Sequence, residues 1–262
     1  MLHSNHSCKN LVILCSGDSP EILFFEDADK RNYELLVIYY GDDPVKFKNK
    51  FKTFDNFQVI KGLKFNIIKK YYDNNNKFFK KYKSIFMPDD DILLRTKDIN
   101  YFFEIFNKYK LSLAQPSLIG YFSHLITLHK FENILRYTNF VEIMMPCFSF
   151  ESFAKCIGTF DMSLNGHGLD FLWPKILNYP NEKIAIIDEI IAIHSRKVGS
   201  NNTYNDNTDY NFFDFMEKNN LNKIQDVIGY VLKEKYDKEI FDENYYPYSE
   251  TFKLLIENYK GN

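Results

Sequence analysis

The chain has 262 residues, of which 45% are hydrophobic, and its 33 basic and 35 acidic side chains leave a net charge of −2. This length and apolar content suit one large α/β domain, with or without a small appendage, and exclude a globally disordered chain. The near-neutral charge provides no bulk basic field, so we expect no nucleic-acid partner.

Short apolar runs that stop at turn residues alternate with segments of helical apolar spacing over the first 200 residues. In chain order we expect strands at 11–15, 35–40 and 57–60, a helix at 65–72, a strand at 82–87, a helix at 98–109, strands at 111–116 and 140–145, helices at 152–157 and 169–177, and strands at 184–187 and 190–194. Strands that alternate with helices favour an α/β fold with a mixed, mainly parallel sheet flanked by helices.

The character of the chain changes after His194. Residues 199–209 are rich in Asn and Thr and lack a periodic apolar pattern, which predicts a loop. Residues 212–218, 221–234 and 248–259 are predicted to form helices. We therefore expect a main domain over residues 9–200, followed by a loop and a C-terminal helical extension over residues 201–262.

The acidic triplet Asp89, Asp90 and Asp91 directly follows an apolar strand that ends at Pro88. Adjacent carboxylates repel one another and need neutralisation, and the carboxyl ends of strands in an open α/β sheet are where ligands bind. Mg²⁺ or Mn²⁺ takes oxygen ligands and bridges phosphates. In an extended segment Asp89 and Asp91 share a side, which makes them candidate metal ligands and leaves Asp90 for a sugar or a basic partner. The alternative is a solvated acidic loop or a helix cap.

A second candidate site is the run Gly166-His167-Gly168-Leu169-Asp170. Two glycines let the backbone pass close to a ligand, and Asp170 then lies near the start of a predicted helix. From that position a carboxylate can take a proton from an acceptor hydroxyl, or it can simply interact favourably with the helix dipole.

Two further candidates lie within predicted strands. His194 ends an apolar strand, where a neutral imidazole either completes a metal site or has a structural role. Glu142 lies inside the apolar run 140–145. A carboxylate there needs a partner, which is either a sugar hydroxyl or a set of backbone donors.

These signals occur in an order that resembles a domain family of plants and bacteria, long labelled as of unknown function and similar to glycosyltransferases of the GT-A fold. The matching stretches are residues 82–91, 111–118, 140–149, 166–171, 186–188 and 194–199. The resemblance covers roughly residues 9–200 and implies a GT-A-like (Rossmann-like) domain that binds a nucleotide sugar and catalyses its transfer. The chain departs from the family pattern at Pro88 and at Asn165-Gly166-His167.

The resemblance also implies roles for individual residues. The acidic triplet matches a strand-end motif whose outer acids bind the cation and the sugar diphosphate, so the implied metal ligands are Asp89, Asp91 and His194. Asp170 matches the acid of a Gly-Leu-Asp run that supplies the general base in inverting enzymes. The residues expected to bind the nucleotide sugar are Ser16, Gly17, Tyr40, Asp42, Asp89 and Asp90. Independently of the resemblance, Glu142 is expected to hold a sugar hydroxyl, and Lys64 or Lys61 is expected near the diphosphate.

Together these expectations describe a metal-dependent, inverting glycosyltransferase with Mn²⁺ or Mg²⁺ as cofactor. Its donor would be a UDP- or GDP-sugar, and its acceptor a glycan or a lipid-linked acceptor, as in polysaccharide biosynthesis. A metal-dependent phosphohydrolase acting on a nucleotide sugar and a non-catalytic nucleotide- or carbohydrate-binding module are the alternatives. Retention of the anomeric configuration also stays open, because Glu142 or Asp170 can line the other face of the sugar.

The expected location is cytoplasmic. The first nine residues are polar, and no apolar run approaches the roughly 18 residues of a membrane helix. A loose attachment to a membrane surface stays open. None of the four cysteines forms a closely spaced CxxC pair, which argues against a zinc knuckle.

Overall fold

The computed structural model describes residues 10–21, 30–197 and 208–233. The elements in chain order are β1 (Asn10–Ser16), β2 (Tyr33–Tyr39), α1 (Pro44–Lys50), β3 (Asn56–Val59), α2 (Lys64–Phe79), β4 (Ser84–Phe86), β5 (Ile92–Leu93), α3 (Thr96–Lys108), β6 (Leu113–Gly120), η2 (Leu125–Thr127), β7 (Asn133–Thr138), β8 (Cys147–Ser149), α4 (Phe150–Cys156), η3 (Ile157–Thr159), α5 (Leu169–Ile176), β9 (Ile184–His194), α6 (Thr208–Lys218) and β10 (Val227–Leu232).

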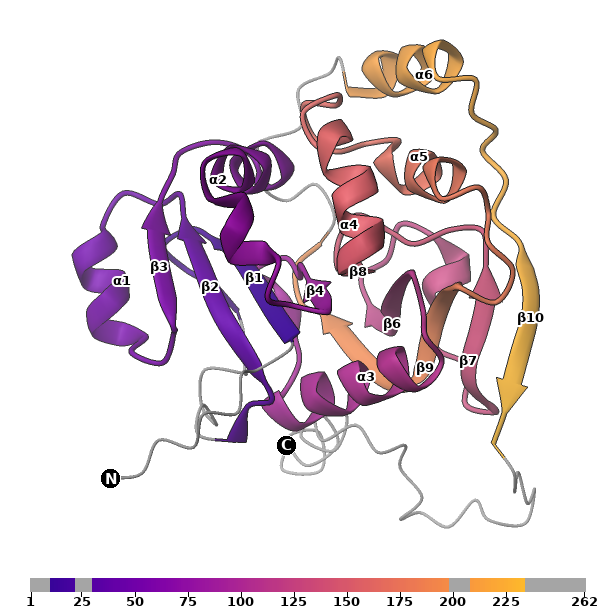
Figure 1. The fold of residues 1–262 in the computed structure, drawn as a ribbon, viewed down its shortest axis with the longest axis horizontal. Helices are drawn as coiled ribbons and strands as arrows, with labels where there is room; N and C mark the ends of the chain where they lie inside the picture. The colour runs from indigo at the N-terminus through magenta and orange to yellow at the C-terminus, as the bar shows by residue number, and fades with distance from the viewer. Residues whose placement is uncertain (1–9, 22–29, 198–207, 234–262) are drawn as a thin grey trace.

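One mixed sheet runs through the molecule (Figure 1). Within the described residues its strand order is β10-β7-β9-β6-β8-β4-β1-β2-β3, and β5 pairs with β9 beside this path. The strands β3, β2, β1 and β4 run parallel to one another. Beyond β4 the sheet is mixed, because β8, β7 and β10 run antiparallel to the strands beside them while β6 and β9 are parallel.

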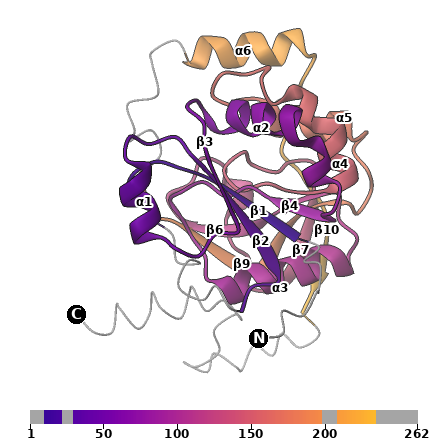
Figure 2. The same cartoon turned by 60° about the vertical axis from the view of Figure 1, so that its left-hand side comes forward.

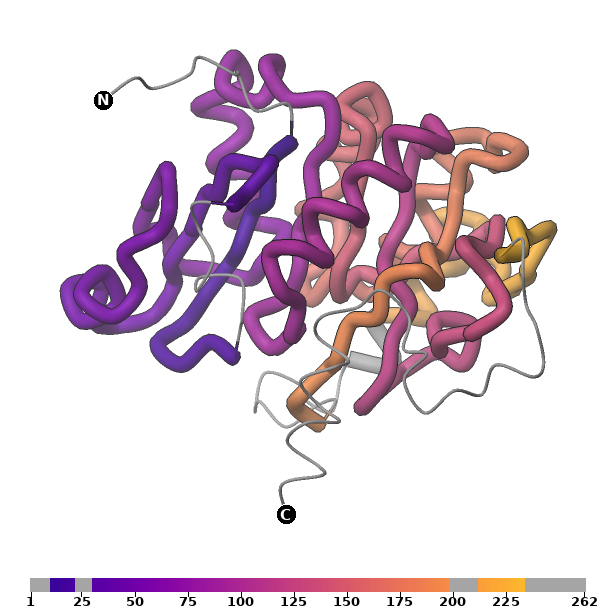
Figure 3. Tube along the Cα trace, turned by 90° about the horizontal axis from the view of Figure 1, so that it is seen from below, coloured from indigo at the N-terminus to yellow at the C-terminus, as the bar shows by residue number. Residues whose placement is uncertain are grey.

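The two faces of the sheet are covered by different helices. Alternate residues of β1 point to opposite faces, as strand geometry requires. Leu11 and Ile13 pack with residues of α2, α4 and α5, whereas Val12 and Leu14 pack with the apolar face of α3. The helices α2, α4 and α5 lie above the sheet and α3 lies below it, as two views show (Figures 1 and 2). Seen from below, α3 crosses the middle of the molecule (Figure 3).

Local sequence explains where several helices begin. Asp43 caps α1 by accepting a hydrogen bond from the backbone N–H of Lys46, and Pro44 occupies the first turn. Ser149 caps α4 in the same way, through the N–H of Ser152. Asp98 lies in the first turn of α3, where its charge interacts favourably with the helix dipole.

Most of the predicted elements are confirmed to within a few residues. β1, β2, β3, β4 and β6 occupy the predicted apolar runs, and α2, α3, α4, α5 and α6 occupy the predicted helical segments. The two late strands are one strand, β9, with a register irregularity opposite Pro116 and Ser117. The expected α/β fold with a mixed sheet between helices is therefore confirmed.

The predicted strand at residues 140–145 is wrong. The segment has no regular structure, because its apolar side chains enter three different clusters: Phe140 one, Val141 a second, and Met144 with Met145 a third. Its backbone forms hydrogen bonds with a neighbouring loop instead of a strand, since the carbonyl of Met144 accepts a hydrogen bond from the N–H of Asp89.

The predicted helix at residues 221–234 is also wrong, because the described part contains the edge strand β10. Its backbone pairs with β7, and its exposed apolar residues Ile228, Tyr230 and Leu232 alternate with period two. The predicted helix at 248–259 lies outside the described residues, as does most of the predicted loop at 199–209. The division of the chain near residue 200 stays a prediction.

Among residues 10–21, 30–197 and 208–233, no helix combines the length and hydropathy that crossing a bilayer requires. Attachment to a membrane surface stays a prediction.

Candidate functional site

A pocket of about 340 Å³ opens where the parallel strands β1, β2 and β4 end. Cys15 from β1, Tyr40 just after β2, and the acidic triplet just after β4 all line it. The N-terminal end of α2 adds Lys64 and Phe65. The pocket therefore lies at the strand ends where ligands bind in open α/β sheets.

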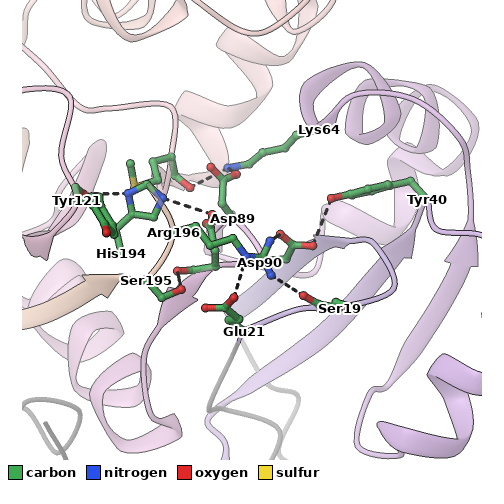
Figure 4. Close-up of polar contacts among 12 residues, drawn as sticks. Ser19, Glu21, Tyr40, Lys64, Asp89, Asp90, Tyr121, His194, Ser195 and Arg196 are labelled. Atoms are coloured by element: carbon green, nitrogen blue, oxygen red, sulfur yellow. Dashed lines mark hydrogen bonds and ion pairs between the residues drawn. The ribbon is translucent and has the colours of Figure 1, made fainter. Parts of the chain in front are cut away.

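Asp90 holds these strand ends together (Figure 4). Its Oδ2 accepts hydrogen bonds from the N–H of Gly17 at 3.0 Å and from the Tyr40 hydroxyl at 3.2 Å. Its Oδ1 lies 3.4 Å from Nη1 of Arg196. Burial raises the pKa of Asp90, although the Gly17 hydrogen bond and the Arg196 charge oppose the rise. Both oxygens of Asp90 are thus engaged within the protein.

Arg196 is a site residue that the sequence did not single out. Besides Asp90, its guanidinium contacts Oε1 of Glu21 at 3.0 Å and donates a hydrogen bond to the carbonyl of Ser19 (Figure 4). It therefore connects the end of β9 to the loop after β1. The signal in the sequence was its position two residues after the candidate His194.

Lys64 neutralises the first acid of the triplet. Its Nζ lies 2.6 Å from Oδ1 of Asp89 and donates to the backbone carbonyls of Ile143 and Met144, each at 2.9 Å. Burial raises the pKa of Asp89 to about 6, against the opposing charge of Lys64. Three acceptors satisfy the three donors of the ammonium group.

Asp91, which lines the pocket, contacts His194, which does not. Its Oδ2 lies 3.3 Å from Nε2 of the imidazole. The Nδ1 of the same ring lies 2.9 Å from the carbonyl of Tyr121 (Figure 4). A carbonyl only accepts, so Nδ1 carries a proton and Nε2 is left for a second proton or a cation. Burial lowers the pKa of His194, but the hydrogen bond and charge of Asp91 raise it above its ordinary value. The other oxygen of Asp91, Oδ1, is buried without a hydrogen-bond partner.

Sheet pairing fixes this contact. β5 begins immediately after Asp91, and in its pairing with β9 Ile92 stands opposite His194. The N–H and Oγ of Ser195 both donate to the carbonyl of Asp91, at 3.1 and 3.0 Å. Two sequence-distant candidates are therefore brought together by backbone register.

Glu142 and Asp170 are buried acids, exposed by 3% and 5%, and neither lines the pocket. Burial raises the pKa of Glu142 to about 8, and the charge of Asp170 adds to the rise. Burial also raises the pKa of Asp170 to about 7, although backbone hydrogen bonds from Phe171 and its neighbours oppose the rise. Oε2 of Glu142 has no hydrogen-bond partner. A pKa near neutrality suits an acid or a base in catalysis.

Aromatic packing holds the two acids in one region. The ring of Phe140, two residues before Glu142, lies 5.0 Å from that of Phe171 and 4.7 Å from that of His124. Nε2 of His124 lies 3.8 Å from Oδ2 of Asp170. Burial lowers the pKa of His124 to about 4, so this imidazole is neutral near pH 7.

Four of the expected nucleotide-binding residues, Ser16, Gly17, Asp42 and Glu142, do not line the pocket. Ser16 is fully buried and its Oγ donates to the carbonyl of Gly17. The side chain of Asp42 is 95% exposed and pairs with Lys61 at 2.6 Å. Their roles in binding a nucleotide stay predictions.

The described residues contain no group of three or more His, Cys, Asp and Glu side chains arranged to hold a metal ion. Asp91 and His194 are the pair that the structure brings together, while Asp89 is engaged by Lys64. The expected three-residue metal site therefore stays a prediction.

The sequence matches no family model, and no curated protein matches it. Among solved structures, the chain resembles TarS of S. aureus with a TM-score of 0.51 and 11% identity. The match covers 80% of this chain and 39% of that one, so the chain spans about two fifths of TarS. A "putative nucleotide-diphospho-sugar transferase" from Desulfovibrio desulfuricans G20 matches with a TM-score of 0.42 and 12% identity, over 80% of this chain and 96% of that one. No inference rests on that second likeness.

At this level of identity the likeness concerns the fold alone. The expected resemblance to a GT-A-like glycosyltransferase fold is confirmed at that level.

Proposed function

We propose that this protein is a glycosyltransferase that binds a nucleotide-sugar donor in the strand-end pocket and holds its diphosphate through Mn²⁺ or Mg²⁺. The observation that carries the proposal is the carboxylate of Asp91. One of its oxygens is buried without a partner, and the other faces Nε2 of His194. Such a carboxylate is costly unless a proton or a cation neutralises it.

The residues present fit a divalent cation. Asp91 offers a carboxylate oxygen and His194 an imidazole nitrogen whose tautomer is already set by the carbonyl of Tyr121. Two protein ligands leave coordination positions for diphosphate oxygens, which is how Mg²⁺ is commonly held beside phosphates. When bound, the cation supplies neutralisation of the charge on the departing diphosphate. Lys64 pairs with Asp89 at the pocket wall, so this carboxylate is already engaged beside the two proposed ligands.

Asp170 is the proposed base. Its pKa of about 7 lies near the operating pH, where a carboxylate is both ionised in part and basic enough to accept a proton. Glu142 lies close enough for the charge of Asp170 to add to the rise in its pKa, so the two carboxyls titrate as a coupled pair. Attack by the acceptor oxygen from this side gives inversion at the anomeric carbon.

The test is a thermal-shift titration with UDP and with GDP, each with and without Mn²⁺. We expect one nucleotide to raise the melting temperature only when Mn²⁺ is present, since a ligand at 100 times its Kd stabilises the folded state by about 2.7 kcal/mol. Asp91→Asn should abolish the shift. Asp73→Asn, on the exposed side of α2, is the matched control and should retain it.

A shift of equal size in Asp91→Asn, or a nucleotide shift that does not depend on Mn²⁺, would contradict the metal assignment. The alternatives are separated by products. A phosphohydrolase releases its product without any acceptor, and a binding module gives the shift but no turnover with any donor and acceptor pair. Product anomer analysis by NMR then decides between inversion and retention.

A further inference from the structure

A second pocket, of about 380 Å³, lies between α6 and the loop that precedes α5. It is separate from the strand-end pocket, but both are lined by Leu164 and Asn165. This two-residue segment, called the wall below, therefore borders both pockets.

The wall is held in place by two glycines in left-handed backbone conformation. Gly166 has φ +80° and Gly168 has φ +89°. A Cβ on Gly166 would lie 2.7 Å from the ring of Phe65, which lines the strand-end pocket, and a Cβ on Gly168 would lie 2.4 Å from the ring of Phe215, which lines the second pocket. Only glycine permits both the conformation and this closeness, so the loop is wedged between the two aromatic rings.

The lining of the second pocket combines apolar and hydrogen-bonding groups. Met162 and Phe212 offer apolar surface, and the side chain of Met162 is well exposed. His167 and Asp214 carry polar groups, and Asp214 and Lys218 contribute one charge of each sign. A balanced pair of charges gives no preference for an anion or a cation. Apolar surface beside hydrogen-bonding groups matches a neutral sugar ring, which has C–H faces and hydroxyl edges.

We propose that the second pocket is the acceptor subsite and that it takes a neutral carbohydrate, whose hydroxyl crosses the Leu164–Asn165 wall toward the donor. This inference rests on the proposed function. The same loop leads directly into α5, which carries Asp170 as its second residue. The acceptor oxygen bonds to the anomeric carbon as the bond from that carbon to the diphosphate oxygen breaks. The proton of the acceptor passes to Asp170, and the bonding electron pair leaves with the nucleoside diphosphate.

The experiment compares three variants of the full chain. Met162→Ala and Asp214→Ala remove one apolar and one polar part of the second pocket, and both side chains are exposed enough for the fold to tolerate the change. Glu217→Ala changes an exposed residue of α6 that does not line the pocket, and it is the matched control. The probes are methyl hexopyranosides, maltose, cellobiose and lactose, which are all neutral. Binding is followed by saturation-transfer-difference NMR and transfer by product formation.

We expect at least one probe to bind the wild type, and both pocket variants to weaken binding and raise the acceptor KM about tenfold. The Mn²⁺-dependent nucleotide shift should be unchanged in all three variants, and Glu217→Ala should behave as the wild type. The inference is overturned if no neutral probe binds, or if both pocket variants keep the wild-type KM, while the nucleotide shift persists. Absence of the nucleotide shift in the wild type instead overturns the proposed function itself.

Discussion

The two sides of the strand-end pocket differ in how fully their polar groups are satisfied. On the side of β1 and β2, both oxygens of Asp90 have partners and the ammonium of Lys64 contacts three oxygens. On the side of β9 and α5, Asp91 and Glu142 each keep a buried oxygen without a partner. Asp170 adds a buried carboxyl with a pKa raised to about 7.

The difference distinguishes residues whose polar groups are paired within the protein from residues whose buried polar groups lack a partner. A satisfied network stabilises the fold, and removing one member leaves others unpaired. A buried unsatisfied acid is a cost to the fold, and such costs are found at functional sites. We therefore expect substitutions on the first side to affect stability, and substitutions on the second side to affect chemistry while leaving the fold intact.

The largest expected effect is that of Asp170→Asn on turnover. Removing a general base costs about 10²- to 10⁴-fold in kcat. The melting temperature should not fall, because the amide removes a buried carboxyl with a raised pKa. Steady-state transfer assays and thermal denaturation measure the two quantities, with Asp161→Asn, an exposed acid, as control. Full transfer activity in Asp170→Asn would contradict the assignment of Asp170 as the general base.

The next largest effect is a loss of stability on the side of β1 and β2, where the polar groups have partners. Asp90→Ala leaves the N–H of Gly17 and the guanidinium of Arg196 without their carboxylate, and should lower the free energy of unfolding by about 3 kcal/mol. Asp42→Ala removes an exposed ion pair with Lys61 and should cost less than about 1 kcal/mol. Urea denaturation measures both. Equal losses for the two variants would contradict the contrast between the two sides.

The smallest effect is a change in pH dependence. The folded-state pKa of Glu142 is about 8, above its ordinary value of 4.5, so the folded chain binds this proton more tightly than the unfolded chain. Stability from this group is complete below about pH 4.5 and is lost as the pH rises to 8. Glu142→Gln removes the loss, so its stability should gain on the wild type by about 1.4 kcal/mol for each pH unit between these two pKa values.

Urea denaturation across that pH range measures the difference. Glu217→Gln, at an exposed position of α6, should follow the wild-type curve. If the stability of the wild type instead changes in parallel with that of Glu142→Gln between pH 5 and pH 8, the pKa of Glu142 is not raised.

The sequence predicted the fold correctly wherever an apolar pattern fitted only one kind of element. Every residue of β1 is buried between the two faces of the sheet, and the apolar stripe of α3 packs on one of these faces, so a continuous apolar run and a helical period predicted them. The strand predicted at 140–145 is wrong because its apolar residues enter three clusters. Its backbone carbonyl at Met144 accepts hydrogen bonds from Asp89 and Lys64 instead of from a neighbouring strand. β10 was not predicted because its segment with a two-residue period is short and its pairing partner, β7, is distant in sequence.

The candidate site followed from the sequence in part. Strand-end position and chain order indicated Asp91 and His194, which the sheet brings together. The same logic did not reveal that Lys64 engages Asp89, because that contact depends on where α2 begins in space. Arg196 was missed for a similar reason, since its partners Ser19, Glu21 and Asp90 come from two other loops.

The pairing of Ile92 with His194 has a consequence for folding fidelity. A slip of one residue between β5 and β9 would turn the imidazole to the opposite face of the strand and away from Asp91. A chain with that slip has no acid and imidazole pair to offer a cation. If the proposed cation binds there, it would stabilise only the chain with the correct register, and would therefore favour that chain over misaligned products of folding.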